Sequence, residues 1–134
     1  MWLSLDPRNK DNTTVVGTWD ERTVPRFFVY DRDRERSLLG FITKCLSGVR
    51  CQVSGVKGIV VVQGPGGFST VRSAVVFAHA VAFASGVPLV AMKDTSGSPV
   101  SLFKKGVALI KKGKSVSAIE PVYGREPNIT LKNQ

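Results

Sequence analysis

Residues 58–72 read GIVVVQGPGGFSTVR, a run of β-branched residues followed by a glycine-rich turn and the start of an apolar segment. No polar side chain interrupts Ile59 to Val62, which is typical of a strand buried on both faces of a sheet. The following turn is sharp, and a helical pattern then runs from Phe68 to Ser85 and ends at Gly86. The stretch therefore predicts a strand–turn–helix unit at the centre of an α/β domain.

The segments on either side extend this unit. Before it, residues 2–5, 13–19 and 25–30 are rich in β-branched and aromatic residues and predict three strands. Apolar residues at helical spacing then predict a helix over 34–47, stopped by Gly48. After it, residues 87–92 predict another buried strand. This order, βββαβαβ, predicts a mixed sheet of about five strands with two main helices, as in the ribonuclease-H-like or actin-like fold.

The pattern weakens after Lys93. Residues 94–99 are a Ser/Gly/Pro loop, and the short apolar run Val107 to Ile110 lies between lysine clusters, which favours an edge strand guarded by charge. Residues 119–131 are expected to be extended. We therefore expect one domain over 1–93, with 94–134 forming a reduced second lobe and a basic extended tail that packs on it.

Composition narrows the class of protein. The chain has 134 residues, of which 43% are hydrophobic, enough for one folded core. No basic stretch followed by an apolar run marks a signal peptide, and no membrane span is expected because Gly86 and Pro88 break the apolar region. Cys45 and Cys51 are expected to be reduced thiols, which fits the cytoplasm. With His79 as the one histidine, no metal site and no Ser-His-Asp or Cys-His catalytic set is expected.

The helix predicted over residues 68–85 has almost no polar side. From Val71 onward its strongly polar residues are Arg72 and His79, which lie seven apart and so on one face. A helix that is apolar nearly all round must be covered nearly all round, and a chain of this length has little to cover it with. We infer that a second molecule covers the outer face. The alternative is that residues 102–116 fold back over this helix.

The glycine-rich stretch resembles a known family. Residues 64–72, then the alanine-rich residues 78–84 and the run Gly86 to Val90, are similar to the signature of the TsaB (YeaZ) family. Leu5-Asp6 resembles the first strand of that family, and residues 120–130 resemble its closing segment. Only about thirty residues stand where family members usually have a second α/β lobe, so the chain resembles a shortened member.

The resemblance implies a function as well as the actin-like (ASKHA) fold. It implies a scaffold without catalytic activity or cofactor in the formation of N6-threonylcarbamoyladenosine at adenosine 37 of tRNA. The expected partner is a TsaD-type catalytic subunit, and indirectly a TsaE-type ATPase; pairing as a homodimer is also expected, and contact with tRNA would be indirect. Family members pair through their first two helices. By spacing, that surface corresponds here to Leu38, Ile42, Arg72, Val75, Val76, His79 and Phe83.

The glycine turn could hold an anion with backbone amides at a helix N-terminus. The candidate residues are Asp6, Gly64, Gly66, Gly67 and Ser69. Neither the Walker nor the Rossmann pattern is present, and glycines also let a helix start close to a strand with no ligand. Pro7 stands where the family has threonine in its first phosphate loop, which weakens the expectation of nucleotide binding.

The net charge of +9 suggests a rival function. Residues 93–134 carry eight Lys or Arg against three Asp or Glu, so the C-terminal part is the more basic. A small RNA-binding module is the alternative, and a degenerate homodimeric pseudo-enzyme of the same fold is another. The residues that would contact RNA are Lys104, Lys105, Lys111, Lys112 and Lys114. Phe103 is the one aromatic residue among them, so base stacking has little support.

Overall fold

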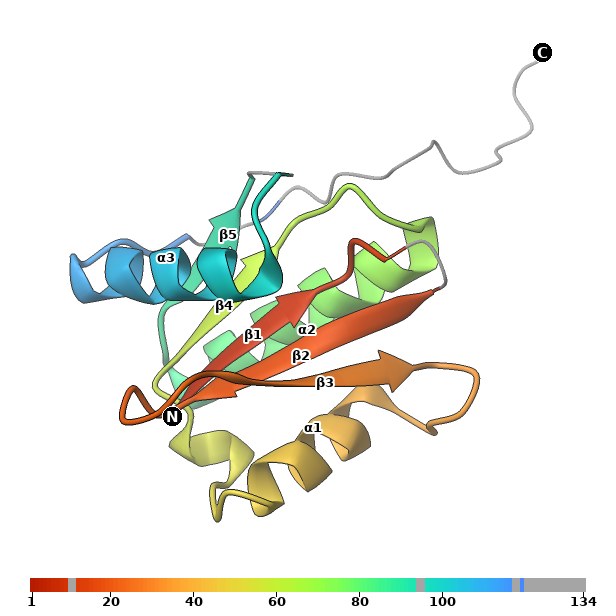
Figure 1. Ribbon diagram of the computed structural model, residues 1–134, viewed down its shortest axis with the longest axis horizontal. Helices are drawn as coiled ribbons and strands as arrows, with labels where there is room; N and C mark the ends of the chain where they lie inside the picture. The colour runs from red at the N-terminus through yellow and green to blue at the C-terminus, as the bar shows by residue number, and fades with distance from the viewer. Residues whose placement is uncertain (10–11, 94–95, 117–118, 120–134) are drawn as a thin grey trace.

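The computed structural model describes residues 1–9, 12–93, 96–116 and 119. Figure 1 shows one sheet with helices on both of its faces. The elements follow in the order β1 (Trp2–Asp6), β2 (Thr13–Trp19), β3 (Arg26–Asp31), α1 (Leu38–Ser47), the short 3-10 helix η1 (Val53–Gly55), β4 (Gly58–Val62), α2 (Phe68–Ser85), β5 (Leu89–Met92) and α3 (Pro99–Lys111).

The sheet has five strands in the order β3-β2-β1-β4-β5. β1 pairs antiparallel with β2, and β2 pairs antiparallel with β3. On its other side β1 pairs parallel with β4, and β4 pairs parallel with β5. Leu3 lies opposite Ile59 at the centre, where every residue of β1 and β4 is buried. The predicted mixed sheet of five strands and its order with the first two helices are confirmed.

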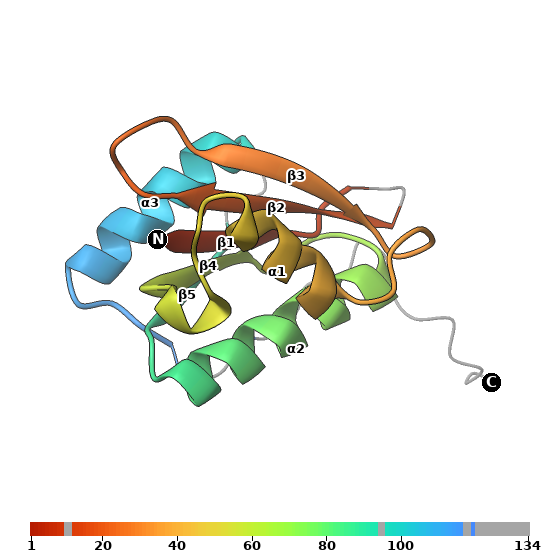
Figure 2. The same cartoon turned by 90° about the horizontal axis from the view of Figure 1, so that it is seen from below.

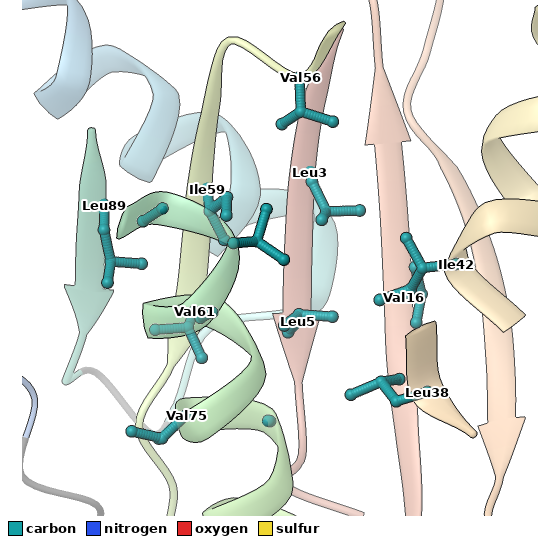
Figure 3. Close-up of a cluster of buried hydrophobic side chains, with 14 of the residues drawn as sticks. Leu3, Leu5, Val16, Leu38, Ile42, Val56, Ile59, Val61, Val75 and Leu89 are labelled. Carbon is teal, nitrogen blue, oxygen red and sulfur yellow. The ribbon is translucent and has the colours of Figure 1, made fainter. Parts of the chain in front are cut away.

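Two apolar clusters hold the helices to the two faces. Alternate residues of the central strands point to opposite faces because the side-chain period of a strand is two. Leu3, Leu5 and Val61 pack with α1 and α2 (Figure 3), whereas Val60 and Val62 pack with α3. Seen from below in Figure 2, α1 and α2 lie on one side of the sheet and α3 lies on the other.

The C-terminal part differs from the prediction. Val107 to Ile110 is not an edge strand, because it lies within the thirteen-residue helix α3, which Ser98 caps by accepting a hydrogen bond from the N–H of Ser101. Leu102, Phe103 and Val107 recur at helical spacing and are buried against the sheet. Residues 99–111 therefore form a third helix that packs on the sheet, where the sequence predicted a loop and a short edge strand. The expected extended segment over 119–131 lies, apart from Ile119, outside the described residues.

The first helix is shorter than predicted. Residues 34–37 precede it, because the carbonyl of Asp31 accepts the N–H groups of Arg34 and Glu35 in a turn. The helix begins at Leu38, where the Ser37 hydroxyl accepts a hydrogen bond from the N–H of Gly40. The second helix has the predicted bounds of Phe68–Ser85, and Gly86 ends it with a left-handed backbone.

Candidate functional site

The outer face of α2 carries exposed apolar side chains. Val76 is 58% exposed and Phe83 is 91% exposed, and their spacing of seven places them on the same side of the helix. Ala80, between them, is also exposed. The opposite side of α2 is packed into the core by small residues such as Ala74 and Ala78, which let the helix lie close to the sheet.

The seven predicted interface residues divide by burial. Arg72, Val76 and Phe83 lie at the surface. The prediction that they lie on the outer surface is wrong for three others, because their side chains face the sheet and form part of the core. These three are Leu38, Ile42 and Val75. Spacing alone did not fix the rotation of each helix about its own axis, so neighbouring residues were assigned to the wrong face.

His79 is half-buried and bonded to its own chain. Its Nε2 accepts a hydrogen bond of 3.0 Å from the main-chain N–H of Ile119. Ile119 is itself buried in the cluster that holds α2 to the sheet. The segment after α3 therefore reaches α2 at one point.

A further exposed apolar residue was missed. Leu39, on α1, is 52% exposed, and α1 and α2 share the same face of the sheet (Figure 2). The sequence indicates that one of the two adjacent residues Leu38 and Leu39 is exposed, because only one of them can face the core. Burial of Leu38 turns Leu39 outward, and the sequence does not say which of the two is buried.

The alternative cover for α2 is not observed. Leu102, Phe103 and Val107 belong to α3, which contacts the other face of the sheet. Within the part of the chain that the structure describes, Val76 and Phe83 stay exposed. By length and composition α2 is also long and apolar enough to cross a membrane. The core helices of soluble proteins meet the same criterion, and the inner face of α2 is buried in the domain.

The glycine turn has a structural reason for its glycines. A Cβ on Gly66 would lie 2.3 Å from the carbonyl oxygen of Pro7 and 2.9 Å from Cγ2 of Val71. Gly66 therefore allows the turn before α2 to approach the chain that follows β1. Gly64 has φ of 116°, a backbone that side chains rarely adopt. These positions need glycine without any ligand.

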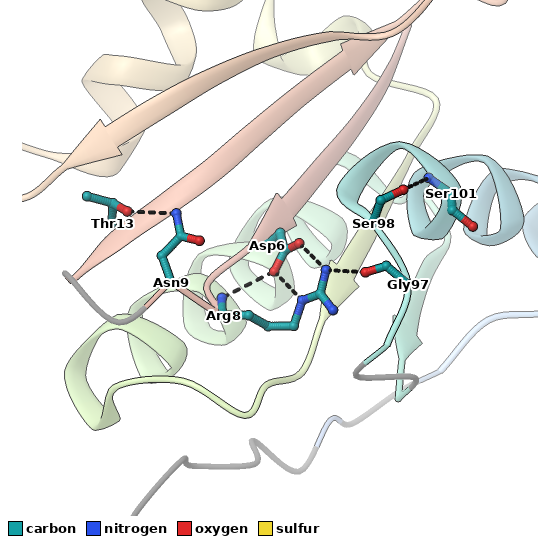
Figure 4. Close-up of polar contacts among 7 residues, drawn as sticks. All are labelled: Asp6, Arg8, Asn9, Thr13, Gly97, Ser98 and Ser101. Atoms are coloured by element: carbon teal, nitrogen blue, oxygen red, sulfur yellow. Dashed lines mark hydrogen bonds and ion pairs between the residues drawn. The ribbon is translucent and has the colours of Figure 1, made fainter.

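Asp6 is held by an arginine of its own chain. The Arg8 side chain donates from Nε to Oδ1 and from Nη2 to Oδ2 of Asp6, both at 2.8 Å, and its main-chain N–H also reaches Oδ1 (Figure 4). The same Nη2 donates to the carbonyl oxygen of Gly97, before α3. Through these bonds Arg8 joins Asp6 at the end of β1 to Gly97 before α3, which is a structural role for Asp6.

Thr70, in the first turn of α2, has an unusual position. The residue is 4% exposed, and within the described part of the chain its Oγ1 is the one buried side-chain polar atom with no hydrogen-bond partner. Leaving a buried hydroxyl unpaired costs about 1–3 kcal/mol. Sequence reasoning gave Thr70 no role.

The five predicted RNA-contacting lysines are all exposed. Two of them interact with other parts of the domain: Lys104 lies 5.8 Å from the centre of the Trp19 ring, and Lys111 forms an ion pair with Glu21. The set lies on and just after α3, across the sheet from α2.

The described residues contain no group of three His, Cys, Asp or Glu side chains that could hold a metal ion. Cys45 and Cys51 are free thiols. Burial raises the pKa of the Cys45 thiol, so it stays protonated near neutral pH.

A mixed sheet in this strand order, with two helices on one face and a third on the other, defines a ribonuclease-H-like, actin-like α/β domain. Residues 24–110, more than half of the chain, match the model of the family described as TsaD, tRNA N6-adenosine threonylcarbamoyltransferase. The chain belongs to this family.

Two solved structures support a YeaZ-like domain. YeaZ from Pseudomonas aeruginosa is 26% identical with a TM-score of 0.54, over 70% of this chain and 45% of that chain. A protein described as uncharacterized, with similarity to peptidase YEAZ from Pseudomonas aeruginosa, gives the same identity and TM-score over 70% of this chain and 44% of its own. This chain thus spans less than half the length of these structures. No curated protein matches.

Proposed function

We propose that this chain is a non-catalytic partner subunit in the formation of N6-threonylcarbamoyladenosine in tRNA. In this proposal it works in the cytoplasm, binds and activates a TsaD-type transferase, and meets a TsaE-type ATPase and the tRNA through that partner. Family membership and the YeaZ-like fold support a role in this modification of tRNA. The ion pair of Asp6 with Arg8 supports a non-catalytic role, because it engages the carboxylate at the end of β1.

The observation that carries the docking surface is the exposure of Phe83 and Val76 on α2, together with that of Leu39 on α1, a helix on the same side of the sheet (Figure 2). Apolar side chains exposed on one face of two helices are typical of a protein–protein interface. We name this set, with Arg72, the α1/α2 face. Large apolar side chains at the centre of an interface contribute most of its binding free energy.

The test is co-purification of the full chain with the TsaD-type subunit of the same genome. We expect a discrete complex for the wild type and its loss in Val76→Asp and Phe83→Asp, because each places a charge in a desolvated contact. Val100→Asp is the matched control, since Val100 is a 41% exposed valine at the start of α3, on the other face of the sheet.

Activation has its own measurement. Adding the wild-type chain to the transferase and the ATPase should raise the yield of modified tRNA, whereas Phe83→Asp should not. If Val76→Asp and Phe83→Asp bind and activate as well as the wild type, the α1/α2 face is not the docking surface. If the wild type forms only a stable homodimer by light scattering and never binds the transferase, the homodimeric pseudo-enzyme describes it better.

A basic RNA-binding module is the second candidate, favoured by the exposure of all five lysines on and after α3. It predicts that the isolated chain binds RNA with an affinity that falls steeply with salt. The variant Lys105→Gln/Lys112→Gln should then weaken binding to any RNA sequence. The partner-subunit proposal predicts weak RNA binding by the chain alone.

A further inference from the structure

A small polar cavity opens beside the N-terminal end of α2, and none of the residues that define the α1/α2 face lines it. Its volume is about 200 Å³, below the roughly 300–1,000 Å³ of pockets for drug-sized ligands. All its lining residues carry hydrogen-bonding side chains and none carries a carboxylate. They are Asn12, Thr14, Tyr30, Arg32, Arg36, Thr70 and Ser73. Ligand pockets are mostly apolar, so this lining favours a small polar ligand.

The charge at the cavity is positive although the neighbouring loop alternates in sign. Arg32 and Arg36 line the cavity and form no ion pair with any described residue. Two of the three acids in the loop pair with other residues, Asp31 with Arg34 at 3.7 Å and Glu35 with Lys44 at 3.3 Å, whereas Asp33 is exposed and does not line the cavity. The cavity lining thus contains two arginines and no acidic residue.

Thr70 and the helix add donors to the same place. Thr70 lines the cavity, is more than nine-tenths buried, and its hydroxyl has no partner. It lies in the first turn of the eighteen-residue helix α2, where the unpaired N–H groups and the helix dipole favour negative charge. Asn12 and Ser73 supply further donors.

Burial raises the pKa of the Tyr30 phenol, so Tyr30 also stays protonated and can donate. Arginines together with hydroxyl and amide donors are the groups that typically bind phosphate oxygens in proteins.

We propose that this cavity binds the phosphoryl group of a small molecule. Such a ligand would accept hydrogen bonds from both arginines and give Thr70 the partner that it lacks. The site differs from the glycine turn before α2, because none of Asp6, Gly64, Gly66, Gly67 or Ser69 lines the cavity. The inference does not depend on the role in tRNA modification.

Inorganic phosphate is the first probe. A ligand that binds only the folded state raises the unfolding temperature with its concentration. We expect the unfolding temperature of the full chain to rise and saturate with phosphate, measured against chloride at constant ionic strength. Isothermal titration calorimetry should give a single site per chain.

Three variants connect the effect to the cavity. Arg32→Gln/Arg36→Gln should weaken phosphate binding by at least about tenfold, because two charge-assisted hydrogen bonds are lost. Thr70→Val should weaken it by about threefold or more while leaving the unliganded protein equally or more stable, because the unpaired hydroxyl is removed. Lys105→Gln/Lys112→Gln, which removes the same charge on and just after α3, should bind phosphate like the wild type.

Ribose 5-phosphate separates a phosphate ester from free phosphate as the natural source. If ribose 5-phosphate binds more tightly than inorganic phosphate, the natural ligand is a phosphate ester. If it binds equally or more weakly, the natural ligand is the free ion. Either result supports the proposal. No response of the wild type beyond chloride would overturn it. So would an Arg32→Gln/Arg36→Gln variant that responds like the wild type, since the stabilisation would then come from general screening.

Discussion

The main-chain N–H of Ile119 donates a hydrogen bond of 3.0 Å to Nε2 of His79, which joins the segment after α3 to the middle of α2. The same segment runs beside β5, where the N–H of Val116 donates to the carbonyl oxygen of Leu89 at 2.8 Å. Because only an unprotonated ring nitrogen accepts, the proton of the neutral imidazole is on Nδ1. His79 therefore holds the end of the described chain in place rather than facing outward.

Replacing His79 tests this contact. His79→Ala removes the acceptor, so we expect the free energy of unfolding to fall by about 0.5–1.5 kcal/mol and the amide of Ile119 to exchange faster with solvent. His79→Gln offers a carbonyl acceptor and should retain part of the protection. Hydrogen exchange measured by NMR reads the amide directly. Unchanged exchange at Ile119 in His79→Ala would show that the bond does not order this segment.

Gly66 tests the close approach of the glycine turn to the end of β1. In Gly66→Ala the new Cβ would overlap the Pro7 carbonyl, a backbone atom that cannot rotate away. We expect a loss of about 1–3 kcal/mol in the free energy of unfolding, typical of overpacking.

Gly48→Ala is the control for this change. Gly48 has φ of −61° and its nearest neighbour to a new Cβ is 3.5 Å away. Alanine there should be neutral or stabilising by less than about 1 kcal/mol. Urea denaturation of both variants gives the comparison, and equal stabilities would contradict the close approach.

Gly106 tests the position of α3, the helix that was not predicted. Its missing Cβ leaves room for Val60, since a Cβ there would lie 2.4 Å from Cγ1 of Val60. Gly106→Ala should therefore lower the free energy of unfolding by about 1–3 kcal/mol. In the Val60→Ala background the same change should cost much less, because the overlapping methyl groups are gone. A double-mutant cycle with no coupling between the two positions would mean that α3 does not lie on β4 as described.

The sheet and α2 could be predicted because their signals are local. Ile59 to Val62 is apolar on both faces, and Gly86 marks a helix end by its own chemistry. The helix α3 was missed because lysines interrupt its apolar stripe. Only when Leu102, Phe103 and Val107 are taken together does the helical spacing of the buried face appear.

The candidate sites depended on information that one sequence does not carry. The rotation of α1 decides whether Leu38 or Leu39 faces out, and that rotation is set by packing against β2 and β3. The polar cavity joins Thr70 of α2 to Asn12 and Arg32, which flank the paired residues Thr13 and Asp31 of β2 and β3. The hairpin register brings Asn12 and Arg32 together, whereas the approach of Thr70 follows from the strand order β3-β2-β1-β4.

Glu21 gives the stability a dependence on acid pH. It forms an ion pair with Lys111 of α3 and accepts a hydrogen bond of 2.8 Å from Nε1 of Trp2, and these two contacts, the lysine first, lower the pKa of its carboxyl group. Because the pKa of Glu21 is lower in the folded protein than in the unfolded chain, the two contacts stabilise the fold fully above the pKa of the unfolded chain, roughly 4.3. This stabilisation is lost as the pH falls through the lower folded value.

Glu21→Gln keeps the size of the side chain and an acceptor for Trp2 but removes the charge. We expect it to lower the free energy of unfolding at pH 7 by no more than about 1 kcal/mol, because the pair is exposed and screened by water. Below pH 4 the difference between variant and wild type should shrink toward zero, and at pH 7 high salt should reduce it as well. Urea denaturation from pH 2.5 to pH 7 measures both curves. A difference that grows as the pH falls would contradict the lowered pKa, because the charged form of Glu21 would then be the less stable one in the folded protein.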